Sequence, residues 1–149
     1  MTAADPSTAT KAAIAALQGA LAAENAAVYG YGVVGAYLSG ADRAAAMKDW
    51  MLHQDARNTV SAMIMKLGAA PEPASAAYEL PFPVDEAASA RRLAATIENG
   101  VTRAYLAVVA VTDPALRAFG ALAMQGPAER AAAWSGTTAA FPGMPSASA

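Results

Sequence analysis

Apolar residues recur every three or four positions along four stretches of the chain. This spacing places them on one face of a helix, as in helices that pack together in a bundle. In the first stretch this face carries Ile14, Leu17, Leu21, Val28, Tyr31 and Leu38. Similar faces follow over residues 46–67 and 93–111, and a weaker one over residues 116–134. No useful length of chain alternates with the period of two that a strand requires, so the pattern predicts an all-α protein.

Capping residues, glycines and prolines mark where these helices begin and end. They predict four helices and a tail, over about residues 8–39, 42–67, 86–112, 114–134 and 136–149. Asp113 and Pro114 are the clearest signal, because Asp is a favoured N-cap and Pro fits the first helical position. We expect a kink near Pro127, since proline lacks the backbone N–H that a helix needs there.

The connection between the second and third helices is long and rich in proline. It covers residues 69–84, and its prolines prevent the helix from continuing: Pro71, Pro73, Pro81 and Pro83. A connection of this length is able to carry the chain along the whole bundle. The sequence therefore predicts one domain over residues 1–149, an antiparallel four-helix bundle with ferritin-like topology.

Composition supports this fold and limits the function. The 149 residues are 56% hydrophobic and 15% charged, which suits one folded domain rather than a disordered chain. The net charge of -2 argues against a nucleic-acid partner, which a basic surface would bind. We see neither a long uninterrupted apolar stretch nor a targeting segment, so we expect a cytoplasmic protein that does not bind membranes.

Polar residues interrupt the apolar faces near the middles of three helices. Glu24 lies on the first face, His53 and Arg57 on the second, and Glu98 and Tyr105 on the third. A buried carboxylate is costly unless it is paired or bound to a metal. Mid-helix residues of an antiparallel bundle lie at similar heights, so the sequence predicts that these five side chains form one buried polar cluster.

Two interpretations of this cluster remain open. In the favoured one, His53 and Arg57 neutralise Glu24 and Glu98 in a structural network, and no cofactor is expected. In the alternative, Glu24, His53 and Glu98 are ligands of iron(II), manganese or zinc. The chain has one histidine and no cysteine, so it cannot contain the two Glu-x-x-His motifs of a typical ferritin-like di-iron site.

Several motifs resemble the DUF4439 ferritin-like domain family. They are the run from Leu17 to Gly35, His53-Gln-Asp-Ala-Arg57, Ala77-Tyr-Glu-Leu-Pro-Phe-Pro-Val, the segment from Glu98 to Tyr105, and Trp134 with Phe141-Pro-Gly. The resemblance covers about residues 12–145 and implies a ferritin-like four-helix bundle of unassigned activity. Family members often have a histidine directly after the glutamate that matches Glu24. Here that position is Asn25, which removes a potential ligand.

One motif points to a different function and is rejected. Gly30-Tyr-Gly32-Val-Val-Gly35 matches the dinucleotide-binding pattern G-x-G-x-x-G. That pattern binds phosphate only between a strand and a helix, whereas this copy lies inside a helical stretch. We interpret it as a site of close helix packing or bending.

The sequence therefore favours a binding or interaction module built around the buried cluster. The alternative is a metal-dependent oxidoreductase that uses iron or manganese at Glu24, His53 and Glu98. The alanine-rich helix faces would also allow two copies of the chain to pack closely as a homodimer. Whether the protein is an enzyme is left open by the residues alone.

Overall fold

The computed structural model describes residues 6–144, so residues 1–5 and the last five residues of the predicted tail lie outside it. Its regular elements are α1 (Pro6–Ala36), α2 (Gly40–Lys66), α3 (Ala87–Val109), α4 (Pro114–Ala123) and α5 (Gln125–Ser135). Every regular element within residues 6–144 is a helix, so the predicted all-α class is confirmed.

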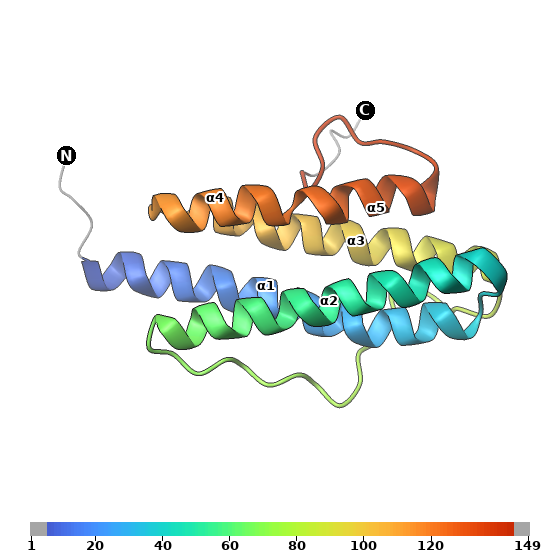
Figure 1. The fold of residues 1–149 in the computed structure, drawn as a ribbon, viewed down its shortest axis with the longest axis horizontal. Coiled ribbons are helices and arrows are strands. Elements are labelled where there is room, and N and C mark those ends of the chain that lie inside the picture. Colours follow the sequence, from blue (N-terminus) through green and yellow to red (C-terminus); the bar gives the residue numbers. More distant parts are fainter. Residues whose placement is uncertain (1–5, 145–149) are drawn as a thin grey trace.

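The helices form a bundle in which α4 and α5 together make the fourth arm (Figure 1). α1 packs against α2 and α3, and α3 packs against α4 and α5. α2 and α3 run in the same direction, because the irregular segment 67–86 crosses from one end of the bundle to the other (Figure 1). The predicted four-helix bundle with a long connection between its second and third helices is thus confirmed.

Several helix ends differ from the sequence prediction by one to three residues. α1 ends at Ala36 rather than at Ser39, and α3 ends at Val109 rather than at Thr112. α2 begins two residues earlier than predicted, at Gly40. Terminal turns have the fewest intrahelical hydrogen bonds, so sequence signals determine these boundaries least well.

The fourth predicted helix is two helices, separated by a turn at Met124. The predicted kink near Pro127 therefore lies one turn earlier in the chain. Pro127 has no N–H to donate to the carbonyl group of Ala123, so the hydrogen-bond ladder is interrupted there. The predicted start of this arm is confirmed, since the side chain of Asp113 accepts hydrogen bonds from two backbone N–H groups of α4.

Gly30, Gly32 and Gly35 all lie within α1, as expected for a motif that does not bind a dinucleotide. A Cβ atom at Gly30 would lie 2.5 Å from Cδ1 of Ile97, so this glycine allows α3 to approach α1. A Cβ atom at Gly32 or Gly35 would meet nothing within 4 Å. Close packing, one of the two expected reasons for this motif, is thus confirmed for Gly30 and does not apply to Gly32 or Gly35.

Two apolar clusters form the core, one toward each end of the bundle. The first is built around Leu17, Leu21, Val60, Ile64, Val101 and Val108. The second is built around Tyr31, Val34, Leu38, Ala46, Leu93 and Ala94. On α2 and α3, His53 and Glu98 lie between these two clusters, and on α1 Glu24 lies between Leu21 of the first and Tyr31 of the second. None of the helices described here is long and apolar enough to cross a membrane.

Candidate functional site

Four helices each contribute a polar side chain to the middle of the bundle. Glu24 on α1, His53 on α2 and Glu98 on α3 are at most 1% exposed. Each lies on the apolar face of its helix, and the three faces meet at the bundle axis, so the side chains converge. Arg130 reaches the same region from α5. The three predicted metal ligands are therefore brought together.

His53 lies between two carboxylates. Its Nδ1 atom is 2.6 Å from Oε2 of Glu24, and its Nε2 atom is 3.1 Å from Oε1 of Glu98. Burial alone would lower the pKa of His53, but the hydrogen bonds to Glu24 and Glu98 outweigh it and raise that pKa to about 9. The ring is therefore an imidazolium at neutral pH, and both nitrogens donate hydrogen bonds.

Two buried tyrosines donate to the same carboxylates. The hydroxyl group of Tyr105 is 2.7 Å from Oε1 of Glu24, and that of Tyr31 is 2.6 Å from Oε1 of Glu98. Burial, followed by the negative charge of the neighbouring glutamate, raises the pKa of both phenols. Both tyrosines are thus neutral donors. The predicted cluster included Tyr105 but not Tyr31.

The fourth arm of the bundle contributes a cation and an indole. Nε of Arg130 donates to Oε1 of Glu98 at 2.8 Å. Nε1 of Trp134 donates to Oδ2 of Asp49 at 2.9 Å, which links α5 to α2. Asp49 is 8% exposed and belongs to the cluster, yet sequence reasoning did not include it. Its position four residues before His53, on the same face of α2, was the available signal.

Arg57 does not join the cluster, which corrects the sequence prediction. Its Nε and Nη2 atoms donate to the side chain of the adjacent Asn58 at 3.3 and 3.2 Å. Arg57 is half-buried and lies one turn beyond His53 along α2. Arg130 instead supplies the second cation of the cluster.

Glu98 is the most heavily bonded carboxylate of the site. Its Oε1 atom accepts hydrogen bonds from Tyr31, His53 and Arg130. Burial would raise its pKa, but the hydrogen bonds from His53 and Arg130 lower that pKa below its usual value. Its Oε2 atom is buried and has no hydrogen-bond partner among the described residues. Glu98 is therefore ionised, with one oxygen saturated and the other unpaired.

This arrangement does not fit a resident metal ion. A histidine that binds a metal presents the lone pair of a neutral ring nitrogen. Both nitrogens of His53 instead face carboxylate oxygens at hydrogen-bond distance. Within residues 6–144, no group of three or more His, Cys, Asp or Glu side chains has a geometry that would hold a metal ion.

A cavity of about 300 Å³ lies beside the cluster, between α2, α3 and the fourth arm. Glu24, Tyr105 and Arg130 line it. Its remaining walls are mostly apolar and come from Leu52, Ala56, Thr59, Phe119, Leu122, Ala123, Gly126 and Pro127. This cavity therefore connects the polar cluster with the surface of the protein.

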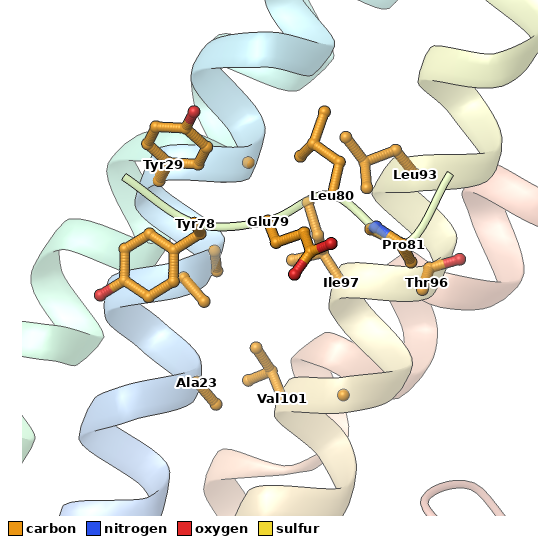
Figure 2. A pocket seen from close by; sticks show the side chains of 14 residues that line it. Ala23, Tyr29, Tyr78, Glu79, Leu80, Pro81, Leu93, Thr96, Ile97 and Val101 are labelled. Atoms are coloured by element: carbon orange, nitrogen blue, oxygen red, sulfur yellow. The ribbon is translucent and has the colours of Figure 1, made fainter. Parts of the chain in front are cut away.

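A second cavity, of about 250 Å³, lies between α1, α3 and the crossover segment (Figure 2). Its walls include Tyr29, Tyr78, Leu80 and Ile97, and the extended segment that contains Glu79 runs across it (Figure 2). No residue of the polar cluster lines this cavity. It is thus separate from the candidate site.

Residues 16–146 match the model of a protein family described as a domain of unknown function, DUF4439. This chain belongs to the DUF4439 family. The structure of this DUF4439 family member also resembles the crystal structure of a conserved hypothetical protein, rv2844, from Mycobacterium tuberculosis. The two are 35% identical with a TM-score of 0.81, over 84% of this chain and 96% of the other. No curated protein matches the sequence. The family resemblance inferred from the motifs is thereby confirmed.

Proposed function

We propose that this DUF4439 protein is a ferritin-like binding module, in which the buried cluster is a metal-free ion network. The observation that carries the proposal is the position of His53, whose two ring nitrogens are both hydrogen-bonded to carboxylates. His53 and Arg130 supply the positive charge that metal ions supply in a di-iron bundle. The chain therefore keeps carboxylates at its centre without needing a cofactor to neutralise them.

The network joins the helices that form the walls of the adjacent cavity. Its hydrogen bonds connect α1 to α2 through Glu24 and His53, and α3 to α5 through Glu98 and Arg130. Breaking a buried ionic pair by removing one partner costs about 3–5 kcal/mol, because the other charge is left uncompensated. In this proposal the cluster fixes the shape of the cavity, and the cavity is where a ligand binds.

Metal analysis of protein purified without an affinity tag tests this proposal. We expect only traces of iron, manganese and zinc, and a melting temperature that does not change when iron(II) is added under anaerobic conditions. A variant that combines Glu24→Gln and His53→Leu should behave in the same way and lose only modest stability, since amide and alkyl groups are able to replace ions in a packed interior.

The opposite result has a clear signature. Metal near one equivalent per chain, or a melting temperature that rises by several degrees with iron in the parent but not in the double variant, would contradict the ion-network proposal. Such a rise is what preferential binding of a metal to the folded state produces.

A metal-dependent oxidoreductase is the second candidate, and one specific observation favours it. Oε2 of Glu98 is buried and has no hydrogen-bond partner in residues 6–144, so a cation would find an unused ligand atom there. Glu24, His53 and Glu98 would then hold iron or manganese, as in the alternative interpretation of the sequence. This function requires His53 to lose a proton and to turn one nitrogen from its carboxylate toward the metal. The metal analysis above distinguishes the two candidates.

A further inference from the structure

We propose that the cavity beside the cluster binds a small amphipathic monocarboxylate. Its carboxylate would pair with the terminal nitrogens of Arg130, and its apolar part would lie against α2 and α4. This inference rests on the proposed function, since it needs Arg130 and Glu98 to be held as an ion pair rather than displaced by a metal.

Arg130, on the cavity wall, has hydrogen-bond donors that are not yet used. Its Nε atom donates to Glu98, whereas its two terminal nitrogens have no hydrogen-bond partner among the described residues. The side chain remains 20% exposed. Gly126 leaves space for the guanidinium group, since a Cβ atom there would lie 3.0 Å from Nη1 of Arg130. Two adjacent N–H donors in one plane match a carboxylate in a bidentate pair.

The other polar groups of the cavity already have partners. The two oxygens of Glu24 accept hydrogen bonds from His53 and Tyr105. The hydroxyl group of Thr59 donates to the backbone carbonyl group of Asp55. A ligand in this cavity must therefore bring an acceptor for Arg130 rather than a donor.

The charge and the size of the cavity restrict the ligand further. One cation lines it, beside Glu24, so a doubly charged phosphate would lack the positive charge that it needs. The walls formed by Leu52, Phe119 and Leu122 are apolar, and Leu122 is 70% exposed at the surface. A volume of about 300 Å³ suits a single carboxylate on a short or medium-length hydrocarbon.

Calorimetric titration of the full chain with octanoate tests the inference, with octanamide as the matched neutral probe. We expect saturable binding of one octanoate per chain. Octanamide should bind about tenfold more weakly, because it loses the charge-assisted pair with Arg130. The variant Arg130→Gln should bind the two probes equally.

Arg130→Gln also removes a partner of buried Glu98 and could therefore destabilise the fold. A second pair of variants, at exposed positions, tests the inference without this effect. Leu122→Glu places a negative charge at the cavity, whereas Met65→Glu places one at a similarly exposed position outside it. Leu122→Glu should weaken octanoate binding by about tenfold or more, and Met65→Glu should leave it unchanged.

Absence of saturable octanoate binding, equal binding of octanamide by the parent, or equal effects of the two glutamate substitutions would each overturn the inference. These outcomes are distinct from failure of the proposed function, which is measured by metal content. If the protein contains only trace metal and does not bind octanoate, the ion-network proposal stands and the ligand inference is contradicted.

Discussion

At the scale of single residues, His53 has a higher pKa in the folded protein than the 6.5 of an unperturbed histidine, because its two hydrogen bonds favour the charged ring. Its stabilising contribution is therefore fully present below about pH 6.5, and it is lost as the pH rises through about 9. Glu98 behaves in the opposite sense. Its pKa lies below the ordinary 4.5, so its contribution is present above that value and is lost on acidification.

These shifts predict how the free energy of unfolding depends on pH. We expect a maximum between about pH 5 and pH 6.5, and a decrease from there to pH 9.5 in urea-unfolding experiments. His53→Leu removes the group that titrates, so its alkaline slope should be much flatter than that of the parent. Parent and variant curves that fall in parallel above pH 7 would show that another group is responsible.

The members of the cluster that the sequence predicted correctly share one property. Glu24, His53, Glu98 and Tyr105 lie on long regular helices, where a period of 3.6 residues determines which side chains face the core. A polar residue on such a face is visible in the sequence. Position along the bundle axis is less visible, which is why Arg57, one turn beyond His53, was wrongly included.

Arg130 was not included in the predicted cluster for a different reason. It lies three residues after Pro127 and next to Ala131, which are buried on α5, but an arginine that directly follows a glutamate is most often solvated. Asp49 was missed because charged residues on a helix are most often solvated. Its hydrogen bonds with Trp134 and Tyr31, from two other helices, make it part of the site.

At the scale of the elements, the backbones of α3 and α4 approach closely at Gly120. A Cβ atom there would lie 3.0 Å from the backbone nitrogen of Val109 and 3.1 Å from the carbonyl oxygen of Tyr105. A backbone neighbour cannot move aside as a flexible side chain does, so the glycine is needed for this contact. Gly32 is the opposite case, because its missing Cβ would face open space.

The two glycines therefore respond differently to the same substitution. Gly120→Ala should lower the melting temperature, because it forces α4 away from α3 despite the better helix propensity of alanine. Gly32→Ala should raise the free energy of unfolding by about 0.5–1 kcal/mol, since it adds helix propensity without a clash. Thermal unfolding followed by circular dichroism checks both, and a stabilised Gly120→Ala variant would contradict the close approach.

The sequence predicted the number of bundle arms and located most helix ends to within a few residues. It did so because prolines, glycines and the cap at Asp113 act locally. The division of the fourth arm was less predictable, because the effect of Pro127 appears one turn upstream, at a residue with no helix-breaking tendency of its own.

At the scale of the whole molecule, the crossover places α2 and α3 in the same direction (Figure 1). α2 and α5 are linked through side chains. The hydrogen bond from Trp134 to Asp49 is one such link. The sequence indicated that a crossover was permitted by the length of the connection. It gave no sign of this link, which depends on the relative placement of two distant helices.

Trp134→Phe tests the importance of this link, with Trp50→Phe as the control. Trp50 is half-buried and packs against the same apolar cluster, but its indole makes no hydrogen bond within the described part of the chain. Loss of the donor to buried Asp49 should cost about 1–3 kcal/mol beyond the effect of Trp50→Phe in urea unfolding. Equal losses in the two variants would indicate that Trp134 contributes only packing.

The central claim is that His53 is a protonated cation between two carboxylates rather than a metal ligand. The chain contains one histidine, so nitrogen NMR of protein labelled with ¹⁵N-histidine observes this ring alone. We predict that both ring nitrogens carry protons at pH 7.5, that the ring titrates with a midpoint near pH 9, and that added zinc leaves both signals unchanged. A neutral ring at pH 7.5, with one unprotonated nitrogen whose signal shifts on addition of zinc, would contradict the account.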